Sequence, residues 1–284
     1  MPEQGHKQGP SLVGILNTTR DSFSDGGEFL EPTAAIEQAR RLVAAGADIV
    51  ELGPASSHPD SEAVSAEEEI ARLAPVVATL GDENIPFGVD SFQSETQRWS
   101  IAHGARMLND IAGFNDEAMW HELAASDCEL VVMHSIQKQG PATRESAGPE
   151  PMMDRVLAFF EDRLGALERA GIARSRMIAD PGMGFFLGVD PAPSVEVLQG
   201  LARLRREVRC RVLVSVSRKS FLGAICAESE TGAPREVAAR LPATLAAELY
   251  AARQGVDMIR THDLQGLADA LRTSLRLEGE DFFV

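Results

Sequence analysis

The chain has 284 residues, of which 44% are hydrophobic, enough for a globular core that needs no disulfide or metal to hold it. Its formal charge of −16 argues against nucleic acid and anionic membrane as partners, so a small anionic substrate would need a local basic pocket. No apolar run reaches the roughly 18 residues of a membrane helix, and the polar first ten residues do not resemble a secretory signal. The odd number of cysteines and the lack of a C-x-x-C pair indicate free thiols in a cytoplasmic protein; they are Cys128, Cys210 and Cys226.

Eight short apolar runs, rich in Val, Ile and Leu, recur along the chain. They do not alternate with polar residues, which is typical of strands buried on both faces. In chain order the predicted strands are 12–16, 48–52, 86–89, 105–108, 129–133, 176–179, 212–216 and 256–259. The segment 135–151 is the longest irregular stretch, and long loops of this kind are often functional or mobile.

Helical patterns lie between the predicted strands. Two of them begin with the signature of a capping box, Ser65–Glu68 and Ser94–Gln97. A glycine that suits a left-handed helix C-terminus precedes several strands, at Gly46, Gly104, Gly171 and Gly255.

This alternation of strand and helix over nearly the whole chain predicts a single (β/α)8 TIM barrel. We expect the barrel to span 12–277, with a disordered tail at 1–11 and a second tail at 278–284. A doubly wound open sheet shares the same pattern and is the alternative fold.

Polar residues follow nearly every predicted strand, at the end where TIM barrels carry their active sites. A surface selected for solubility would favour Lys and Glu there, whereas this chain has mainly Asn, Asp and His. In chain order these residues are Asn17, His58, Asp90, Asn109, Asp110, His134, Asp180, Lys219, Ser220, Arg260 and His262.

The polar residues divide by charge into two groups. Asp90, Asn109 and Asp180 can bind the N–H donors of a nitrogen heterocycle, which would fill buried acceptors that are costly to leave unpaired. The second group, Lys219, Arg260 and His262 with His58 as a further candidate, forms a cationic pole suited to phosphate or pyrophosphate. Asn17 could bind a Mg²⁺ ion carried by a pyrophosphate, because Mg²⁺ prefers oxygen ligands.

Each of these positions also has a structural interpretation. Asp180 precedes Pro-Gly and could serve only as a turn residue. His134 could be a core histidine with its hydrogen bonds satisfied. Asn109 and Asp110 could cap a helix.

Four motifs resemble the signatures of the dihydropteroate synthases, and they occur in the family's order over about residues 12–276. They are Gly14–Gly27, Asp180–Phe185, Ser217–Phe221 and Arg260–Asp263. The resemblance implies a TIM-barrel transferase that joins 6-hydroxymethyl-7,8-dihydropterin pyrophosphate to p-aminobenzoate and releases pyrophosphate. It also implies Mg²⁺ as cofactor and a homodimer.

The resemblance further implies roles for individual residues. The pterin would be bound by Asp90, Asn109, Ile111, Met133, Asp180, Gly184 and Lys219. The pyrophosphate would be bound by Asn17, His58, Arg260 and His262, with Asn17 on the metal. The p-aminobenzoate would be bound by Ser57, Pro59, Phe185, Phe186 and Ser220. The catalytic set would be Lys219, Arg260, His262 and Asp90, and the loops 18–27 and 54–64 would close over the site.

The chain departs from the usual family pattern at a few positions. Arg20 replaces a proline, His58 replaces a loop arginine, and Phe186 and Leu187 stand where the family continues Gly-Lys, in a stretch about two residues longer by hand alignment. These departures are shared with the plasmid-borne, sulfonamide-insensitive branch of the family. We therefore predict sulfonamide tolerance, through a clash that rejects the extra bulk of the drug.

Two other functions compete with this interpretation. A methyltetrahydrofolate methyltransferase would share the Asp90, Asn109 and Asp180 set but would not need the cationic pole. A catalytically impaired pterin-binding paralogue would retain the fold without turnover.

Overall fold

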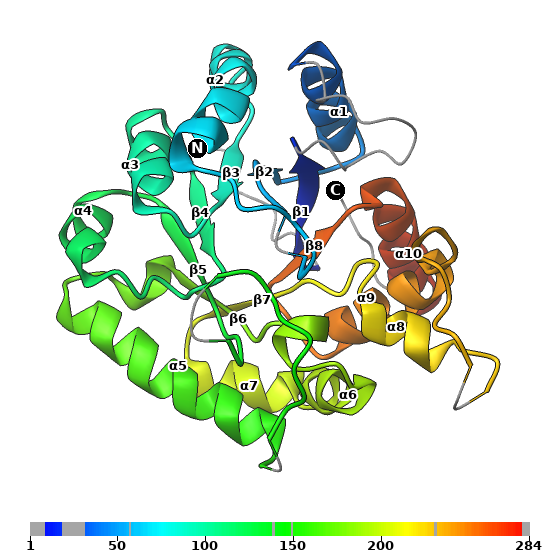
Figure 1. The fold of residues 1–284 in the computed structure, drawn as a ribbon. Helices are drawn as coiled ribbons and strands as arrows, with labels where there is room; N and C mark the ends of the chain where they lie inside the picture. Colours follow the sequence, from blue (N-terminus) through cyan, green and yellow to red (C-terminus); the bar gives the residue numbers. More distant parts are fainter. Residues whose placement is uncertain are drawn as a thin grey trace.

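In a computed structural model the chain forms a closed barrel of eight parallel strands with helices around it (Figure 1). The structure describes residues 9–18, 32–56, 58–137, 140–148, 150–229 and 232–279. The strands are β1 (Ser11–Asn17), β2 (Ile49–Gly53), β3 (Phe87–Asp90), β4 (Met107–Asp110), β5 (Glu129–Met133), β6 (Met177–Asp180), β7 (Arg211–Val214) and β8 (Met258–Thr261). The predicted TIM barrel is therefore confirmed, and the ladder that pairs β8 with β1 excludes an open sheet.

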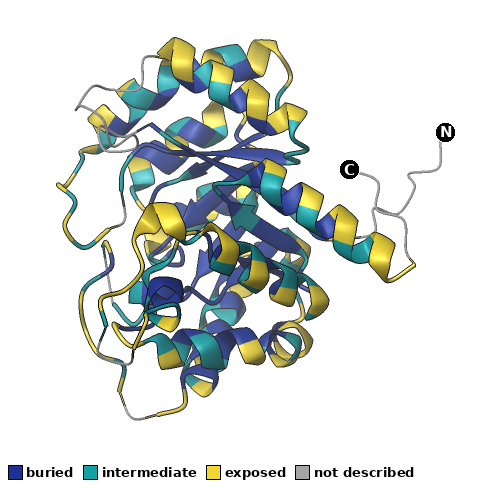
Figure 2. Cartoon of the chain, turned by 90° about the vertical axis from the view of Figure 1, so that its right-hand side faces the viewer, coloured by how far each residue is buried: buried dark blue, intermediate teal, exposed yellow. Residues whose placement is uncertain are grey.

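The helices lie on the outside of the barrel and turn their apolar faces toward the strands, as the burial colours in Figure 2 show. On α1, for example, Ala35, Ala39 and Leu42 are buried while Val43 is exposed. The helices are α1 (Pro32–Ala44), α2 (Ala66–Asp82), α3 (Ser94–Ala102), α4 (Trp120–Ala125), α5 (Met152–Arg169), α6 (Pro191–Gln199), α7 (Leu201–Val208), α8 (Ser220–Ile225), α9 (Leu241–Arg253) and α10 (Leu264–Leu277).

One of the two predicted capping boxes is present. The Ser65 side chain accepts from the Glu68 amide while the Glu68 side chain accepts from the Ser65 amide. The second prediction is wrong, because the N-cap of α3 is Gln93 and the Ser94 hydroxyl donates instead to Asp116. A neighbouring carboxylate thus competes successfully for that hydroxyl. The predicted helix-ending glycines all have positive φ, at Gly46, Gly104, Gly171 and Gly255.

The barrel interior is filled at its lower level by a layer of apolar side chains from the strands. These residues form their own cluster, separate from the larger core between strands and helices, and they are Val13, Ile49, Met107, Val131, Ile178, Leu213 and Met258. Because side chains alternate along a strand, the residue two positions later on each strand points to the same side. The residues two positions further along the strands therefore form the next interior layer.

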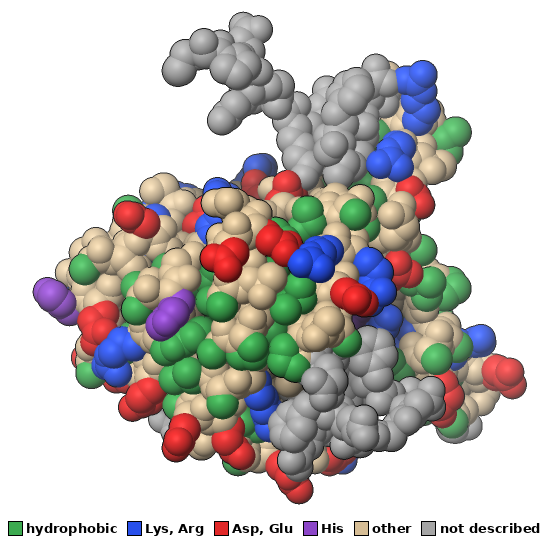
Figure 3. Space-filling view, turned by 90° about the horizontal axis from the view of Figure 1, so that it is seen from above, with side chains coloured by type: hydrophobic (Ala, Val, Ile, Leu, Met, Phe, Trp, Pro, Cys, Tyr) green, Lys and Arg blue, Asp and Glu red, His purple; other side chains and the backbone are tan. Residues whose placement is uncertain are grey.

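The described surface carries charges of both signs. Acidic and basic side chains are interspersed on the face drawn in Figure 3, so the net negative charge forms no single patch there. Among the described residues, no helix is long and apolar enough to span a membrane. Cys128, Cys210 and Cys226 are free thiols. Most of the predicted tails, and the loop residues 19–31 with Arg20, lie outside the described residues.

Candidate functional site

A polar layer lies directly above the apolar layer, toward the carboxyl ends of the strands. Ile49, Met107 and Met258 of the lower layer are followed two residues later by Glu51, Asn109 and Arg260. Ile178 is followed in the same way by Asp180, and the β3–β4 ladder places Asp90 opposite Asn109. The register of the barrel thus brings these five side chains to one interior level.

Arg260 of β8 is bound by two carboxylates inside the barrel. Its Nε donates to Glu51 Oε1 on β2, and its Nη2 donates to Asp90 Oδ2 on β3 at 2.7 Å. The Arg260 side chain is 14% exposed and that of Glu51 is fully buried. Burial alone would lower the pKa of Arg260, but Glu51 and Asp90 raise it overall, so the guanidinium stays charged. A fixed cation therefore lies among the strand ends.

The two carboxylates that bind Arg260 respond to burial in the opposite way. Burial raises the pKa of Glu51 to about 7, although Arg260 acts against this shift and Asp90 adds to it. Burial also raises the pKa of Asp90, against the effect of Arg260 and Lys219. Both acids are thus costly to ionise, and their charge depends on Arg260.

Asn109 has an unsatisfied oxygen in this layer. Its Nδ2 donates to Glu51 Oε2 at 3.3 Å, but its buried Oδ1 has no hydrogen-bond partner among the described residues. Such groups are rare in folded proteins and are expensive unless a ligand or water fills them. Asn109 therefore presents a vacant acceptor for an N–H donor.

Asp180 ends β6 and has the turn role that its position before Pro-Gly suggested. Its Oδ1 accepts from the Gly182 amide at 2.8 Å, which holds the following turn. Burial raises its pKa to about 6, while the Gly182 amide, Lys219 and Arg260 favour the carboxylate. Gly182 has φ 71°, and a Cβ there would lie 2.2 Å from the His134 carbonyl oxygen. The turn is consequently restricted to glycine.

Lys219 lies between the polar layer and the segment Gly184–Phe186, a short 3-10 turn that follows β6. The Lys219 stem packs on Gly184, where a Cβ would lie 3.5 Å from its Cδ, and its Nζ lies 5.1 Å from the centre of the Phe186 ring. The Ser220 hydroxyl lies beside the same glycine. Burial lowers the pKa of Lys219 to about 8, with Arg260 acting in the same sense and Asp180 and Asp90 against it.

His262 follows β8 and is largely buried. Burial lowers its pKa to about 3, and Arg218, Arg260 and Lys219 add to this effect. Its Nδ1 lies 3.0 Å from the Ser217 hydroxyl. A lowered pKa favours a neutral imidazole, which is a hydrogen-bonding group, over the cation that the sequence suggested.

Four apolar side chains form a separate cluster at the mouth of the barrel, and they are Ile111, Met133, Ala142 and Phe186, with Phe185 packed against them. One surface thus carries residues predicted to contact both substrates. They are Ile111 and Met133 for the pterin, and Phe185 and Phe186 for the p-aminobenzoate. A flat ring can bury its faces against such a surface while its edges face the polar layer.

The loops above this cluster are joined through exposed contacts. Arg144, in the loop after β5, makes a bidentate ion pair with Asp60, in the loop after β2, at 2.9 and 2.5 Å. The Arg144 guanidinium lies 5.9 Å from the Phe185 ring, and His58 makes an edge contact with the same ring. Pro59 lies between His58 and Asp60 and is half-buried, whereas Ser57 falls outside the described residues.

The segment Gly184–Phe186 is also fastened through its backbone. The Ile136 amide donates to the Phe186 carbonyl at 3.0 Å, and Gln137 Nε2 donates to the Phe185 carbonyl at 3.2 Å. The loop after β5, which the sequence marked only as long and irregular, therefore holds the two phenylalanines in place.

Asn17 is the predicted metal ligand. Its side chain lies over Gly53, where a Cβ would approach Asn17 Oδ1 to 2.8 Å. Among the described residues, no three His, Cys, Asp or Glu side chains form a metal-binding group. A lone amide oxygen fits Mg²⁺ only if substrate phosphates and water complete the shell, which is the usual way this ion is bound.

Two strand-end residues have structural roles. His134 is buried, its Nδ1 lies 3.2 Å from the Pro181 carbonyl oxygen, and its ring packs edge-on against Phe159. Asp110 accepts from the Ala112 and Phe114 amides at 2.7 and 3.0 Å and so holds the turn after β4. The interpretation of His134 as a core histidine is therefore correct, and Asp110 is a turn residue.

The sequence analysis did not identify Glu51. It stands inside an apolar run, in the sequence Asp48-Ile49-Val50-Glu51-Leu52, and was counted as part of the strand. A carboxylate in the middle of a buried strand is itself a signal, because such a group is almost never buried without a partner. Its partner Arg260 is 209 residues away in the chain, so only the closed barrel reveals the pair.

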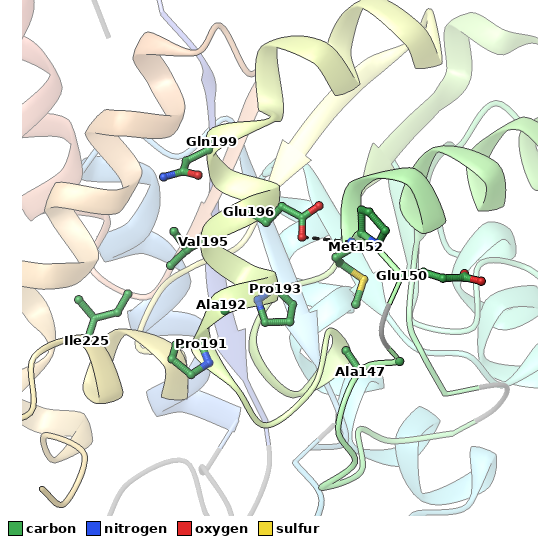
Figure 4. Close-up of a pocket in the computed structure, with 12 residues that line it drawn as sticks. Ala147, Glu150, Met152, Pro191, Ala192, Pro193, Val195, Glu196, Gln199 and Ile225 are labelled. Carbon is green, nitrogen blue, oxygen red and sulfur yellow. Dashed lines mark hydrogen bonds between the residues drawn. The ribbon is translucent and has the colours of Figure 1, made fainter. Parts of the chain in front are cut away.

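A groove with a volume of about 740 Å³ lies outside the barrel mouth, between the start of α5 and α6. Figure 4 shows that Pro191, Pro193, Val195 and Ile225 line the groove. Glu196 accepts a hydrogen bond there from the Met152 amide. It contains none of the predicted site residues.

Comparison with known proteins identifies the family of the chain. Residues 13–262 match the family model described as pterin binding enzyme. The chain is 51% identical to dihydropteroate synthase type-2 of Escherichia coli over 92% of this chain and 93% of the relative. It is 46% identical to dihydropteroate synthase type-3 of Escherichia coli, over 94% and 98%. The dihydropteroate synthase of Xanthomonas albilineans, solved with 4-aminobenzoic acid, superposes with a TM-score of 0.84 at 32% identity, over 95% of this chain and 93% of that one.

Proposed function

Because this chain belongs to the pterin-binding family and, within it, to the dihydropteroate synthases, we propose that the polar layer and the loops of its barrel mouth carry out that family's reaction. The enzyme is a transferase that condenses 6-hydroxymethyl-7,8-dihydropterin pyrophosphate with p-aminobenzoate. The products are 7,8-dihydropteroate and pyrophosphate. The C–O bond to the pyrophosphate breaks, and a C–N bond to the arylamine forms at the same methylene carbon.

The vacant Asn109 oxygen is the observation that carries pterin binding. A pterin offers several N–H donors along one edge, and Asn109, Asp180 and Asp90 supply acceptors at one level of the barrel. The rings would pack on Ile111 and Met133 of the apolar cluster. A ligand that fills these acceptors removes the cost of leaving them buried and unpaired.

Pyrophosphate departure would be stabilised by Arg260, Lys219 and His262. Arg260 uses Nε and Nη2 for the two carboxylates, and among the described residues no acceptor binds Nη1, which is available for phosphate oxygens. Bound Mg²⁺, held through Asn17 and the phosphates, would supply further charge stabilisation. Preorganised charge of this kind is the main catalytic contribution available to a site without a covalent nucleophile.

The arylamine would bind between the two phenylalanines and Ser220. The loop contacts from Asp60 and Arg144 hold Phe185 on one side, and Gln137 holds the segment backbone. Enclosing the reacting carbon excludes water, which would otherwise compete with the amine for a developing cation.

Sulfonamide tolerance follows from the same segment. Phe186 is 4% exposed, packs in the apolar cluster and faces Lys219, while Leu187 is fully buried. A phenylalanine fixed at this position would narrow the arylamine side of the apolar cluster that it shares with the predicted pterin contacts Ile111 and Met133. It would admit a flat p-aminobenzoate and exclude a bulkier sulfonamide.

The chain also has features that suit a homodimer. Large hydrophobic side chains are exposed on neighbouring elements, with Ile225 of α8 54% exposed, Val237 50% and Leu241 of α9 39%. Exposed apolar groups of this kind are often buried in an interface. We propose a cytoplasmic homodimer through this face, and light scattering of the purified protein would show twice the chain mass of 30.6 kDa.

The activity is tested with the purified enzyme, the pterin pyrophosphate, p-aminobenzoate and Mg²⁺. We expect 7,8-dihydropteroate and pyrophosphate in equal amounts, with turnover lost when Mg²⁺ is chelated and restored when it is added back. Pterin binding without turnover in the presence of Mg²⁺ would instead indicate an impaired paralogue.

Sulfonamide tolerance is tested by inhibition with sulfamethoxazole against varied p-aminobenzoate. We expect the inhibitory constant to exceed the KM for p-aminobenzoate by more than about 10²-fold, since a steric clash of a few kcal/mol gives such a ratio. An inhibitory constant close to that KM would refute the proposal.

A further inference from the structure

Glu51 belongs to the polar layer, but the proposed reaction gives it no role. It stands in the middle of β2, and its side chain is fully buried. Both of its carboxylate oxygens are used, since Oε1 accepts from Arg260 Nε and Oε2 accepts from Asn109 Nδ2 at 3.3 Å. One carboxylate therefore joins a residue proposed to bind pyrophosphate to a residue proposed to bind the pterin.

Neutralising Arg260 does not by itself explain the presence of Glu51. Asp90 already binds the same guanidinium, through Nη2 at 2.7 Å. A buried carboxylate is expensive, so a second one on the same guanidinium needs a further reason. The hydrogen bond from Asn109 to Glu51 supplies that reason.

The register of the barrel lets Glu51 on β2 reach Asn109 on β4, across the strand that lies between them. The β2–β3 ladder places Gly88 beside Glu51. Because glycine has no side chain, the barrel interior at this point stays open for the Glu51 side chain. A Cβ at Gly88 would lie 3.0 Å from the Met107 side chain, so a larger residue there would disturb this part of the interior.

The contact with Glu51 determines which end of the Asn109 amide faces the site. A carboxylate can only accept hydrogen bonds, whereas a primary amide has a donor end and an acceptor end. The Asn109 nitrogen must therefore face Glu51, as it does. The Asn109 oxygen, which is buried and has no partner among the described residues, is left to face away from Glu51. Glu51 thus makes Asn109 an acceptor toward a ligand, although an asparagine could equally be a donor.

Arg260 favours the form of Glu51 that this orientation needs. Burial raises the pKa of Glu51 to about 7 and Asp90 adds to this effect, while Arg260 and the hydrogen bond from Asn109 favour the carboxylate. A protonated Glu51 would have an O–H to donate, and the Asn109 amide could then turn over. The carboxylate predominates at pH 8, so binding is best compared at that pH.

We propose that Glu51 is a positioning residue that fixes the orientation of the Asn109 amide, so that the site presents an acceptor to the N–H edge of the pterin. The inference rests on the proposed pterin site. It also gives a reason for substrate choice, because a heterocycle with an acceptor at this edge would face the lone pairs of Asn109 Oδ1. Glu51 acts through Asn109 and needs no contact of its own with the substrate.

Glu51→Gln tests this orientation, because the new side chain has the same size but only one acceptor oxygen. Arg260 Nε can only donate, so it takes that oxygen. The new amide nitrogen then faces Asn109, whose own amide must turn over to accept. The site would now present an N–H group to the pterin. We expect the Kd for 6-hydroxymethyl-7,8-dihydropterin, measured by calorimetric titration at pH 8, to rise by about 10- to 100-fold.

The same variant should leave the anion-binding end of the site in working order. Arg260 keeps an acceptor at Nε and keeps Asp90 at Nη2. We expect the Kd for inorganic pyrophosphate with Mg²⁺ to rise by no more than about threefold, since removing a nearby negative charge does not weaken the attraction of an anion. Weaker pyrophosphate binding with unchanged dihydropterin binding would contradict the proposal, because Glu51 would then act only through Arg260.

The double variant Glu51→Gln/Asn109→Asp provides a matched rescue, because it exchanges the carboxylate and the amide between two positions without changing the total charge. The amide on β2 would accept from Arg260 and donate to the carboxylate on β4, whose second oxygen would face the pterin. We expect the Kd for the dihydropterin to return to within about fivefold of the wild type, since the two changes compensate each other. Impaired binding in Glu51→Gln without recovery in the double variant would overturn the proposal.

Stability gives a further readout, which remains available if Glu51→Gln does not fold. Asn109→Asp alone sets one carboxylate against another. We expect it to melt about 5 °C below the double variant, in which an amide faces the carboxylate. Equal melting temperatures would show that the two side chains do not interact, which would refute the proposal.

Neutron diffraction separates this inference from the proposed function, because it locates amide deuterons without any ligand. We expect Asn109 Nδ2 to face Glu51 in the wild type and Oδ1 to face the same position in Glu51→Gln. If this reversal is seen but the wild type binds no dihydropterin, the orientation by Glu51 stands and the proposed pterin site fails. If the wild type turns over its substrates but the amide keeps one orientation in both proteins, the inference is wrong and the proposed function stands.

Discussion

The interior polar layer and the loops above it differ in how they are held. Glu51 and Arg260 project from strands whose register is fixed by the closed barrel, and both are largely buried. The loop contacts depend on the Arg144–Asp60 pair, whose side chains are 54% and 58% exposed. Exposed pairs contribute little to stability, whereas removing one member of a buried pair costs several kcal/mol.

The contrast places the proposed catalytic groups and the proposed selectivity groups in different parts of the molecule. Groups that must lie within a fraction of an ångström of the reacting atoms come from the strands, where the barrel itself positions them. In the proposed function, the groups that decide which arylamine enters come from the loops, which can vary in length without disturbing the register. Substitutions in the polar layer and in the loops should therefore affect different properties of the enzyme, and the sizes of their effects should also differ.

The largest effect is expected for Arg260→Met. It removes the charge that we propose for pyrophosphate binding and leaves Glu51 and Asp90 without their partner. We expect kcat/KM to fall by at least about 10³-fold and stability to fall by about 3 kcal/mol. Arg260→Lys keeps the charge without the planar fork, and steady-state kinetics should show an intermediate loss. Full activity in Arg260→Met would contradict the polar layer as the catalytic site.

A smaller effect is expected for Asn109→Ala, which removes the vacant acceptor. Loss of one hydrogen bond to a buried group should raise the Kd for the pterin pyrophosphate by about 10- to 100-fold in calorimetric titration. Asp110→Asn is the control, because Asp110 is the next residue on the same strand and binds the following turn and the Gln97 side chain. It should lower the melting temperature without changing the Kd.

The pH profile tests the charges of the polar layer. The carboxylate of Asp180, whose pKa is raised to about 6, is needed to accept N–H donors, so kcat/KM should fall as the pH drops through 6. The charge of Lys219, whose pKa is lowered to about 8, is lost as the pH rises through 8, so kcat/KM should fall there too. Lys219→Arg should move the alkaline limit upward. A flat profile between pH 5 and 10, measured as initial rates in a constant-ionic-strength buffer, would argue against these assignments.

In the loop layer, Phe186→Ala should lower the inhibitory constant of sulfamethoxazole by about tenfold or more while the KM for p-aminobenzoate changes by less than about threefold. The substitution also opens a cavity, so stability should fall by about 3 kcal/mol. Phe185→Ala removes the neighbouring, more exposed ring and should have the smaller effect on the drug. Equal inhibition of the wild type and Phe186→Ala would mean that this ring does not select against sulfonamides.

The smallest effect is expected for Asp60→Asn, which weakens the exposed pair with Arg144. We expect the KM for p-aminobenzoate to rise by about two- to threefold, with stability unchanged within about 0.5 kcal/mol. Higher salt should reduce the difference between variant and wild type, because screening already weakens the pair. A tenfold loss of kcat would show that the loops take part in the chemistry.

The sequence predicted the strand layer far better than the loop layer. Buried parallel strands leave continuous apolar runs, and their ends are marked by residues such as Asp90, Asn109 and Asp180, so local patterns sufficed. Glu51 was missed because its charge is explained only by Arg260, at the other end of the chain.

The loop contacts could not be predicted because they join segments that no periodic pattern connects. Arg144 and Asp60 are 84 residues apart, and both stand in irregular sequence. The capping box expected at Ser94 failed for a related reason, since Asp116 lies 22 residues further along the chain. Non-local polar contacts of this kind depend on the finished fold.

Gly182 limits where this loop can accept substitutions. Any side chain at this pivot would collide with the His134 carbonyl, so a library randomised at codon 182 should return only glycine among active clones. Phe185 and Phe186, which follow soon after Gly182, do not have the positive φ that restricts Gly182. Changes in drug response would therefore arise by insertion or substitution of residues after Gly182, while Gly182 itself is retained.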